Sequence, residues 1–489
     1  MQLEVISPFD GSVYGTLPAT PPQDVPVAIA RARQAQAVWA EVPPVTRARV
    51  LTKLARGIMA NRDRILDVIQ AETGKSRLSA FEEVMDAGRA VRVFASRSPR
   101  LLRPIRRGGA IPVLTRTFEH HRPVGVVGII NPWNYPFNLP ASDAAQALLA
   151  GNAVVLKPDS QTPFTALLLA ELFADAGLPD GLFQVLPGSG AELGPELVAG
   201  VDYLMFTGST ATGRKLAVAC AERLIGFSGE LGGKNPLLVL ADANLQAAAA
   251  GTVRAAFANT GQVCVGIERA YVVDSVYDEF VADLVRITAG LRLGIGNDWQ
   301  LDVGSLASAK QLATVAQHVD DAVAKGATVL AGGRDRPDLG PFVYEPTVLT
   351  GVTEEMTLFR EETFGPVLAV YRVASEEAAI AAANDTRYGL NASIWSAHGE
   401  AIAGRIRAGT VNINEGFAAT WGSHAAPMGG MGESGMGRRH GSQGLLKYTE
   451  PQTVSRQRLH PIAPPDALGN EGYAKVMTAA IRVLNRLGG

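Results

Sequence analysis

A thiol and a carboxylate in separate parts of the chain could do chemistry. Cys264 ends the run Asn259-Thr260-Gly261-Gln262-Val263-Cys264, where an expected helix gives way to a turn with glycine. Its thiolate would be a nucleophile whose pKa depends on its surroundings. Glu230, in Gly229-Glu230-Leu231-Gly232-Gly233, stands just before an apolar run and is placed to act as a general base. The ordinary alternatives are a small buried hydrophobe and a surface carboxylate at a turn.

An amide donor follows the first expected strand of a sheet. Asn134 lies in Asn131-Pro132-Trp133-Asn134-Tyr135-Pro136-Phe137 and could present its amide to a developing oxyanion. Turns of this aromatic and proline-rich kind also serve simply as packing devices. The other cysteine, Cys220, follows an alanine-rich helix and is expected to be a buried small side chain.

Two further segments could meet a nucleotide. The run 206–214, FTGSTATGR, follows a strand and opens a helix, so that glycine and a helix N-terminus could approach a phosphate. It is neither the three-glycine dinucleotide fingerprint nor a Walker loop. The run 157–163, KPDSQTP, also lies past a strand, where ligands bind in open parallel sheets. Its alternative is an ordinary turn before a helix capped by Thr162.

The elements that position these residues alternate between strand and helix. After a mainly helical first hundred residues, with helices at 23–40 and 45–72, short β-branched runs alternate with helices. The expected strands of this first series are 124–130, 153–156, 182–186, 203–206 and 236–240, and its helices are 138–150, 162–176, 190–199 and 209–222. A second series has strands at 270–273, 327–331, 367–373, 392–395 and 410–413, with helices at 243–258, 310–325, 375–384 and 399–407. Crossovers of this length predict parallel sheets in an α/β protein.

Three segments lie outside both series. Residues 113–121 and 445–458 alternate like strands, and we expect them to pair with each other or with another subunit. The tail 461–489 opens with three prolines and continues with a short amphipathic helix. That helix is expected to pack on the body, with a place at a membrane surface as the alternative.

Composition sets outer limits on function. The chain has 489 residues and a formal charge of −2, which gives no electrostatic reason to expect a nucleic-acid partner. Two cysteines are too few for a disulfide framework or a cysteine-rich zinc site, so no metal is expected and a reducing compartment fits better. The first residues do not have the pattern of a secretory signal, and no apolar run reaches the roughly 20 residues of a membrane span. We therefore expect a cytoplasmic protein with no membrane partner.

Taken together, these motifs resemble the aldehyde dehydrogenase superfamily up to about residue 455. The resemblance rests on the order and wording of the five runs above, and also on Glu361-Glu362-Thr363-Phe364-Gly365-Pro366-Val367 and on Pro427-Met428-Gly429-Gly430 with Ser434-Gly435. It implies a Rossmann-like cofactor domain at 1–112 and 122–242 and an α/β catalytic domain at 243–420. It also implies a β-arm for oligomerisation at 113–121 and 445–458, followed by the tail 461–489. A homodimer or homotetramer is expected.

The resemblance also implies catalytic roles. Cys264 would attack the aldehyde, the Asn134 amide and the Cys264 backbone N–H would stabilise the oxyanion, and hydride would pass to the nicotinamide. Glu230 would then activate the water that releases the acid from the thioester. A glutamate at this place favours hydrolysis over transfer to coenzyme A.

The same resemblance assigns the cofactor contacts. They are Trp133, Lys157, Pro158, Asp159, Ser160, Gly208, Ser209, Leu231, Glu362 and Phe364. Many NAD-preferring members have a glutamate where this chain has Ser160, and that carboxylate would repel a 2′-phosphate. Because Ser160 is neutral and Lys157 is near, NADP is expected to be preferred, with NAD also accepted. Asp159 is a nearby negative charge that acts against this preference.

The expected substrate is a small aldehyde, with succinate semialdehyde leading. The amino-acid sequence of residues 157–179 resembles that of NADP-type succinate-semialdehyde dehydrogenases. Ser423 falls where such enzymes have a serine that holds the substrate carboxylate. Two arginines that assist this serine in such enzymes are replaced by Ser142 and Ala258, whose small side chains predict a wide entrance to the substrate site. Arg269 and His424 are candidate substitutes.

Other functions remain open at this stage. The main alternative is a bulkier aromatic or aliphatic aldehyde as the substrate. A non-catalytic scaffold is disfavoured by the intact Cys264, Glu230 and Asn134. A thiol hydrolase would need a partner histidine, and the seven histidines lie in no recognisable motif with Cys264.

Overall fold

The computed structural model describes residues 2–111, 114–459 and 461–486. The chain divides into two compact units. Unit 1 consists of Met1–Leu102 and Arg122–Glu450, and unit 2 of Arg103–His121 and Pro451–Gly489. Among the described residues no helix is both long and apolar enough to cross a membrane.

Unit 1 begins with an element that the sequence analysis missed, a β-hairpin of β1 (Gln2–Ile6) and β2 (Val13–Pro18). Helices follow, as predicted: α1 (Val25–Glu41), α2 (Pro44–Ala60), α3 (Arg62–Thr73) and α4 (Arg77–Leu101). The stretch expected as helix from 45 to 72 is split at Asn61. Helix α3 ends at Gly74, whose φ of +71° suits glycine, and Ser76 caps α4 by accepting from the Ser79 backbone N–H.

The first large sheet has six strands in the order β17-β9-β8-β5-β6-β7. Its strands are β5 (Val126–Ile130), β6 (Ala153–Lys157), β7 (Phe183–Val185), β8 (Tyr203–Thr207), β9 (Gly226–Glu230) and β17 (Gly435–Met436), of which only β17 pairs antiparallel with its neighbour. Crossovers are made by α5 (Asn138–Ala150), α6 (Pro163–Asp175), α7 (Gly190–Gly200) and α8 (Thr210–Glu222). These helices match the predicted ones to within a residue or two. Strand β9 was not predicted, because GFSGE has little β-branched character.

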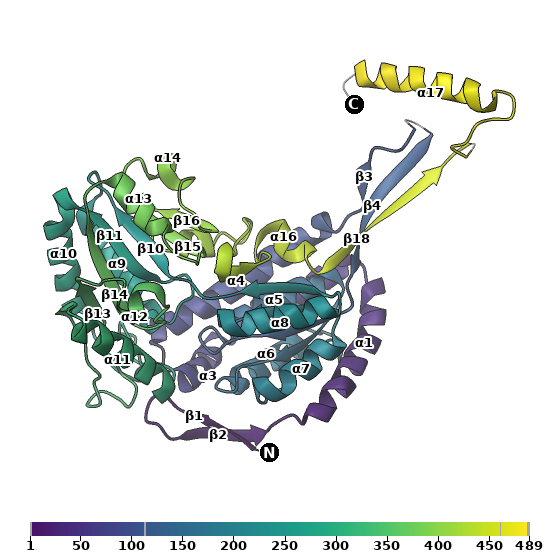
Figure 1. The fold of residues 1–489 in the computed structure, drawn as a ribbon. Helices are drawn as coiled ribbons and strands as arrows, with labels where there is room; N and C mark the ends of the chain where they lie inside the picture. The colour runs from purple at the N-terminus through teal and green to yellow at the C-terminus, as the bar shows by residue number, and fades with distance from the viewer. Residues whose placement is uncertain (1, 112–113, 460, 487–489) are drawn as a thin grey trace. The chain divides into compact units, whose positions relative to one another are not determined.

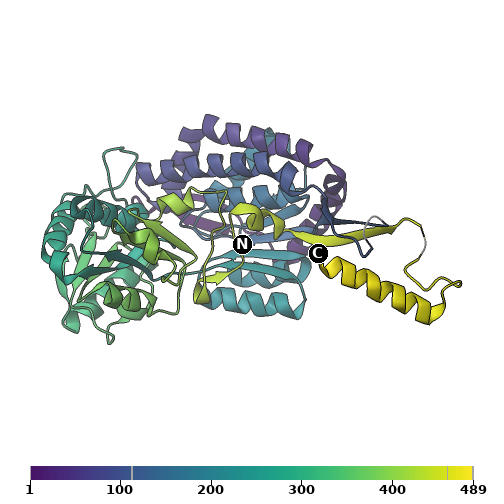
Figure 2. The ribbon, with the colours of Figure 1, turned by 90° about the horizontal axis from the view of Figure 1, so that it is seen from above.

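The second sheet has seven strands in the order β12-β13-β14-β11-β10-β15-β16, and it lies beside the first in unit 1 (Figures 1 and 2). Its strands are β10 (Asn235–Val239), β11 (Ile267–Val273), β12 (Thr328–Ala331), β13 (Thr347–Thr350), β14 (Val367–Val373), β15 (Asn391–Trp395) and β16 (Thr410–Ile413). Its helices include α9 (Leu245–Phe257), α10 (Asp274–Ala289), α11 (Ala309–Ala324), α12 (Thr357–Arg360), α13 (Glu376–Asn384) and α14 (Gly399–Ala403). Helix α10 and strand β13 were not predicted.

One strand was placed in the wrong series. The run 236–240 was expected in the first sheet, but β10 pairs with β11 and β15 of the second. The sequence of a fully apolar strand does not indicate to which of two sheets it belongs, because both faces of either sheet are covered. The strand therefore begins the second α/β fold, ahead of the predicted boundary at residue 242.

Unit 2 contains the outlying strands. The expected segments 113–121 and 445–458 pair with each other as β4 (Thr115–Pro123) and β18 (Thr449–Gln457), with β3 (Ile105–Arg107) completing the order β18-β4-β3. Residues 112–113 lie outside the described part of the chain. The start of the second segment is not strand: it belongs to α16 (Gly441–Leu446) in unit 1. The predicted tail helix is α17 (Gly469–Arg486), and residues 487–489 are not described (Figure 1).

Candidate active site

Cys264 follows a backbone segment in a strained conformation. After α9 the chain passes through Asn259, Thr260 and Gly261 with φ of 50°, 57° and 69°. Consecutive left-handed residues that are not glycine cost free energy and persist only where the surroundings hold them. Glycine is required at 261, because a Cβ there would lie 2.1 Å from the carbonyl oxygen of Gly365. The nucleophile candidate thus sits at the end of a tightly held turn.

Asn134 is tied to this turn. Its backbone oxygen accepts from the Asn259 side-chain amide at 3.2 Å, and its own Nδ2 donates to the Gln262 oxygen at 3.0 Å. The residue is 3% exposed, and its side-chain oxygen has no hydrogen-bond partner within the described chain. Asn134 and Cys264, 130 positions apart in sequence, are therefore held by one hydrogen-bonded loop cluster.

A buried ion pair supports the Asn134 loop. Lys75 Nζ lies 2.7 Å from Glu83 Oε2 and donates to the Asn134 oxygen at 2.6 Å. Glu83 Oε1 accepts from the backbone N–H groups of Phe137 and Asn138 at the start of α5. Both charged side chains are at most 1% exposed, so each depends on the other for its charge. This support was not predicted, because neither Lys75, between α3 and α4, nor Glu83, within α4, indicates in sequence that it contacts the Asn134 loop.

We expect Lys75→Met to destabilise the protein by about 3–5 kcal/mol, because it leaves Glu83 as an unpaired buried charge. Urea unfolding measures the loss. Lys53→Met, at an exposed position of α2, is the matched control and should change the free energy of unfolding by no more than about 0.5 kcal/mol. The double variant Lys75→Met with Glu83→Gln should recover part of the stability. Equal urea midpoints for Lys75→Met and Lys53→Met would contradict the stabilising role assigned to the Lys75–Glu83 ion pair.

Glu230 is the last residue of β9 and its carboxylate is buried. Its Oε2 has no partner in the part of the chain that the structure describes. Gly429 permits this placement, because its φ is +155° and a Cβ there would lie 2.9 Å from Glu230 Oε1. Burial raises the pKa of Glu230 to about 7, against the opposing charges of Arg439 and Lys447. Such a carboxyl can exchange a proton near neutral pH.

The two cysteines differ in their neighbours. Desolvation raises the pKa of the Cys264 thiol to about 12; the nearby Arg439 lowers it, while Glu230 and Glu362 add to the rise. In these surroundings the thiol is therefore protonated at neutral pH. Cys220 is fully buried in the core around the six-stranded sheet, as expected for a structural side chain.

A cavity of about 240 Å³ joins these groups. It gathers all three predicted catalytic residues with six of the predicted cofactor contacts, and it adds Pro132, Thr207 and Gly232, which were not predicted as site residues. The predicted residues that line it are Asn134, Glu230, Cys264, Trp133, Gly208, Ser209, Leu231, Glu362 and Phe364. A thiol, an amide and a carboxylate around one cavity could attack a carbonyl, hold an oxyanion and activate water.

One wall of this cavity is fixed by buried charges. Glu268 accepts from the backbone N–H groups of Thr363 and Phe364 and pairs with Lys234 at 2.5 Å. Phe364 has a φ of +53° and meets the Trp133 ring edge to face, with centroids 5.6 Å apart. Burial raises the pKa of Glu362 to about 8, and its Oε1 accepts from the Gly233 N–H. Glu268 and Lys234 were missed, since their contacts are made only in the folded chain.

The run 157–160 does not line this cavity. Lys157 is buried at the end of β6, with its pKa lowered by desolvation, and Pro158 beside it is also buried. Asp159 Oδ1 accepts from the Gln161 N–H within its own turn, and Ser160 Oγ donates to the Gly188 oxygen at 3.0 Å. The Lys157 ammonium lies at the start of α7, 3.5 Å from where a Cβ on Gly190 would stand.

Thr162 does not cap α6 with its side chain. Its hydroxyl is buried and has no hydrogen-bond partner among the described residues. The first N–H groups of α6, those of Phe164 and Thr165, instead donate to the carboxylate of Glu72 at the end of α3. A distant carboxylate replaces the local cap, and a sequence pattern cannot indicate that replacement.

A second cavity, of about 710 Å³, lies between α7 and α8. Its walls are mainly apolar and come from Val198, Phe206, Leu216 and Ala219, with glycines at 190 and 194 of α7. A mostly apolar cavity next to Lys157 and the start of α7 suits a heterocycle and its attached phosphates. The residues that line the two cavities therefore fit the parts of a dinucleotide.

The predicted carboxylate contacts are not found together. Ser423 is exposed and its hydroxyl donates to the Ala419 oxygen at 2.7 Å; it does not line the cavity at Cys264. The Arg269 guanidinium is bound to the oxygens of Lys234 and Tyr271, and His424 lies 3.0 Å from Asp86. These two candidate substitutes are therefore already engaged within the protein. Ser142 is buried within α5, and Ala258 is partly exposed at the end of α9.

Apolar side chains form a cluster that includes Cys264. The cluster contains Val263, Val265, Leu390, Met428 and the partly buried Tyr135, Phe417 and Trp421. Trp421 belongs to the short helix α15 (Ala418–Trp421), and its indole N–H donates to Asp86. These contacts surround the thiol with aromatic and aliphatic carbon.

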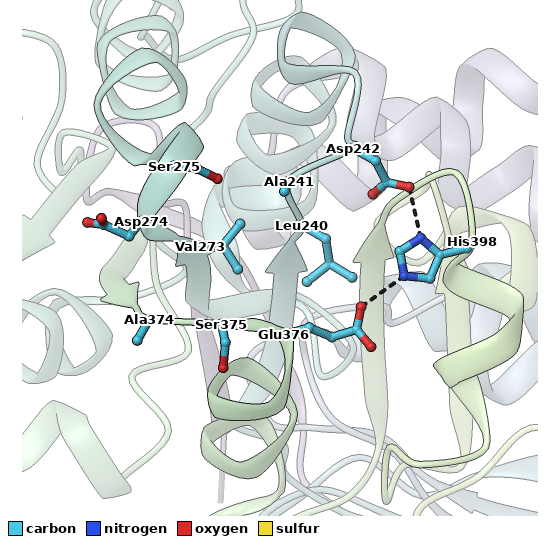
Figure 3. Close-up of a pocket in the computed structure, with 10 residues that line it drawn as sticks. All are labelled: Leu240, Ala241, Asp242, Val273, Asp274, Ser275, Ala374, Ser375, Glu376 and His398. Carbon is cyan, nitrogen blue, oxygen red and sulfur yellow. Dashed lines mark hydrogen bonds and ion pairs between the residues drawn. The ribbon is translucent and has the colours of Figure 1, made fainter.

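Another cavity, of about 350 Å³, lies at the carboxyl ends of strands in the seven-stranded sheet (Figure 3). His398 lies between Asp242 at 2.9 Å and Glu376 at 2.8 Å, and these contacts raise its pKa. The lining residues include neither a cysteine nor an amide side chain. This cavity thus lacks the thiol and the amide donor that the cavity at Cys264 brings together.

An Arg439–Asp143 pair close enough to act on the charge of Glu230 was also missed by the sequence analysis. Arg439 makes two hydrogen bonds to Asp143, at 3.1 and 2.9 Å, and one to Thr207 at 2.6 Å. Both charged residues are 1% exposed. The charge of Arg439 acts on Glu230 and on Cys264 alike, so this pair helps set the acidity of both.

Fold and site together define an α/β protein with a cysteine, an amide and a carboxylate around one cavity. The family model described as "Aldehyde dehydrogenase family" matches residues 1–454. The chain belongs to the aldehyde dehydrogenase family, and it is an enzyme of the oxidoreductase class.

Similar proteins agree with this membership. A protein of Mycolicibacterium smegmatis named "Putative succinate-semialdehyde dehydrogenase (NADP+)" is 52% identical over 484 residues, covering 98% of this chain and 94% of that protein. The 4,4'-diapolycopene aldehyde oxidase of Methylomonas is 40% identical over 472 residues, covering 94% of this chain and 86% of that protein. Among solved structures, an E. coli NADP-dependent enzyme matches with a TM-score of 0.90 and 35% identity, over 94% of this chain and 95% of the other.

Proposed function

We propose that this enzyme oxidises succinate semialdehyde to succinate with NADP, through a thioester on Cys264. The observation that carries the proposal is the single cavity that holds Cys264, Glu230 and Asn134. The substrate rests on the similarity to the mycobacterial relative and its printed name. When bound, the oxidised nicotinamide supplies a hydride acceptor.

The roles of the protein groups follow from their chemistry. Cys264 bonds to the aldehyde carbon, while the Asn134 side-chain amide and the Cys264 N–H donate to the resulting oxyanion. Glu230, which carries a raised pKa, takes a proton from the water that attacks the thioester and releases the acid. Trp133, Phe364 and Glu362 line the side where the cofactor ring would be held.

NADP is favoured by the groups at the start of α7. Ser160 is neutral, the Lys157 cation is near Gly190, and Asp159 is turned into its own loop. The Ser189 side chain makes no capping hydrogen bond to α7, which leaves the first N–H groups of that helix for a phosphate. This arrangement suits a 2′-phosphate.

We expect Ser160→Glu to lower the ratio of kcat/KM for NADP over NAD by tenfold or more. A carboxylate about 4 Å from a phosphate charge costs roughly 1–4 kcal/mol in a partly wet site. Initial rates with both cofactors measure the ratio. Ser160→Gln has the same size without the charge and should keep most of the preference. A parent enzyme that already prefers NAD strongly would refute the cofactor proposal.

A second candidate substrate is a bulkier apolar aldehyde. It is favoured by the aromatic cluster of Tyr135, Phe417 and Trp421 around Cys264 and by the prior engagement of Arg269 and His424. An unpaired carboxylate is poorly held among apolar side chains. The similarity to a diapolycopene aldehyde oxidase points the same way.

A panel of aldehydes separates the two candidates. Rates of NADPH formation are compared for succinate semialdehyde, benzaldehyde and a medium-chain aliphatic aldehyde. The leading proposal expects the highest kcat/KM for succinate semialdehyde. A tenfold advantage for a neutral aldehyde would replace it with the second candidate.

We further propose that the enzyme is a cytoplasmic homodimer or homotetramer. Both cysteines are free, which suits a reducing compartment. The extended β3-β4-β18 sheet of unit 2 offers strand edges on which copies can associate. Light scattering in solution gives the number of copies.

A further inference from the structure

Helix α17 has two faces of opposite character. Tyr473, Val476, Met477, Ala480 and Ile481 follow the 3- and 4-residue spacing that places side chains on one face of a helix. The charged residues Glu471, Lys475, Arg482 and Arg486 fall on the opposite face by the same spacing. None of the helix's described side chains is buried, and Val476 and Ile481 are each 52% exposed. The helix also lies beyond residue 454, where the match to the family model ends.

Unit 2 is strongly basic within a weakly acidic chain. Its nine basic residues are Arg103, Arg106, Arg107, Arg116, Arg456, Arg458, Lys475, Arg482 and Arg486, and its three acidic residues are Glu119, Asp466 and Glu471. Its formal charge is therefore +6, while the whole chain carries −2, so unit 1 carries −8. The positive charge is concentrated in the same unit as the exposed apolar face.

We propose that unit 2 attaches the enzyme to an anionic phospholipid surface, with α17 lying in the interface plane. An apolar helix face inserts at the boundary of headgroups and acyl chains, while a cationic face remains with the headgroups. Each Lys or Arg close to an anionic leaflet strengthens attachment by roughly fivefold. The helix and the basic residues thus supply the two signals that stable peripheral attachment requires.

Charge favours the lipid over a second copy of the chain as the occupant of this face. A second α17 packed on this face would bring Lys475, Arg482 and Arg486 against the same three cations, whereas an anionic bilayer is complementary to them. The cytoplasmic leaflet carries the required negative potential. This attachment is independent of which aldehyde the active site takes.

Co-sedimentation of the full-length enzyme with lipid vesicles tests the proposal. Vesicles of phosphatidylcholine mixed with phosphatidylglycerol are compared with vesicles of phosphatidylcholine alone. We expect at least tenfold stronger binding to the mixed vesicles. Binding should fall by at least tenfold at about 1 M salt, where charges are screened beyond roughly 3 Å. Equal binding to both vesicles, or no sedimentation with either, would overturn the proposal.

Paired variants separate the helix face from a general effect on the fold. Met477→Asn with Ile481→Asn places two amides on the apolar face and should lower vesicle binding by at least tenfold. Thr478→Asn with Ala479→Asn makes the same kind of change away from the centre of that face and should lower it less than threefold. Both proteins should keep the parental rate of aldehyde oxidation.

Light scattering on the same variants identifies the competing occupant. The proposal expects the Met477 and Ile481 double variant to keep the parental mass in solution. A smaller mass, with vesicle binding unchanged, would assign the face to a second copy and overturn the lipid assignment. Vesicle binding by this variant equal to that of the parent would overturn it as well.

Discussion

Replacing Cys264 with alanine is expected to lower the rate of aldehyde oxidation by roughly 10⁴-fold or more, because no other thiol lines the cavity at Glu230. The variant should still bind the dinucleotide, whose proposed contacts with Trp133, Glu362 and Phe364 do not involve the sulfur. NADPH absorbance measures the rate, and quenching of protein fluorescence by the cofactor measures the binding.

Cys220→Ala is the matched control for this loss. Cys220 is fully buried in the core of the six-stranded sheet, and burial raises the pKa of its thiol to about 11. Its removal should change kcat by less than about threefold. A Cys264→Ala enzyme that kept a tenth of the parental rate would show that the oxidation does not pass through this sulfur.

Replacing Glu230 with glutamine is expected to slow release of the acid by about 10²–10⁴-fold, the usual range for loss of a positioned general base. The first turnover should persist, so that a burst of NADPH equal to the enzyme concentration precedes a slow steady rate. Stopped-flow absorbance resolves the two phases.

The pH dependence provides a second test of the same residue. Burial raises the pKa of Glu230 to about 7, so the carboxylate needed to take a proton from water is depleted below that pH. The steady rate of the parent enzyme should therefore rise with pH, with a midpoint near 7, and then level off. The Glu230→Gln enzyme should lose this step. A parental rate that stays flat between pH 6 and 8, the range about one pH unit either side of that midpoint, would argue against Glu230 as the base.

The alternation of apolar strands and helices predicted most of the two α/β parts of unit 1. Runs such as 203–206 and 367–373 are short, β-branched and bounded by turns, and local pattern suffices for such elements. The failures have local causes too. Strand β9, which carries Glu230, contains glycine and serine and was therefore not predicted as a strand. Strand β10 was predicted as a strand, but because it is apolar on both faces its sheet could not be predicted.

The candidate site was predicted as a set of residues rather than as a geometry. Cys264, Glu230 and Asn134 were predicted from sequence motifs and the family resemblance, and the structure places them around one cavity. Their supports could not be predicted, because Lys75 with Glu83, and Arg439 with Asp143, are joined only by tertiary contacts. Asn259 and Thr260 are likewise ordinary residues in sequence, and their left-handed conformations arise from the packed turn.

The substrate side of the site shows where sequence reasoning was weakest. Arg269 was a candidate partner for a carboxylate because arginine so often plays that part. In the fold it instead donates to backbone oxygens at the end of α13. A charged residue in a sequence motif indicates that a binding partner exists, but it does not identify that partner. Whether the partner is a ligand or another part of the chain depends on long-range packing.

The most direct test is mass spectrometry of the Glu230→Gln enzyme, quenched in acid during the slow phase with aldehyde and NADP. The account predicts that the peptide carrying Cys264 gains the mass of the acyl group, and that the peptide carrying Cys220 is unchanged. Stoichiometric formation of NADPH with no acyl group on Cys264, or with the acyl group on Cys220, would contradict it.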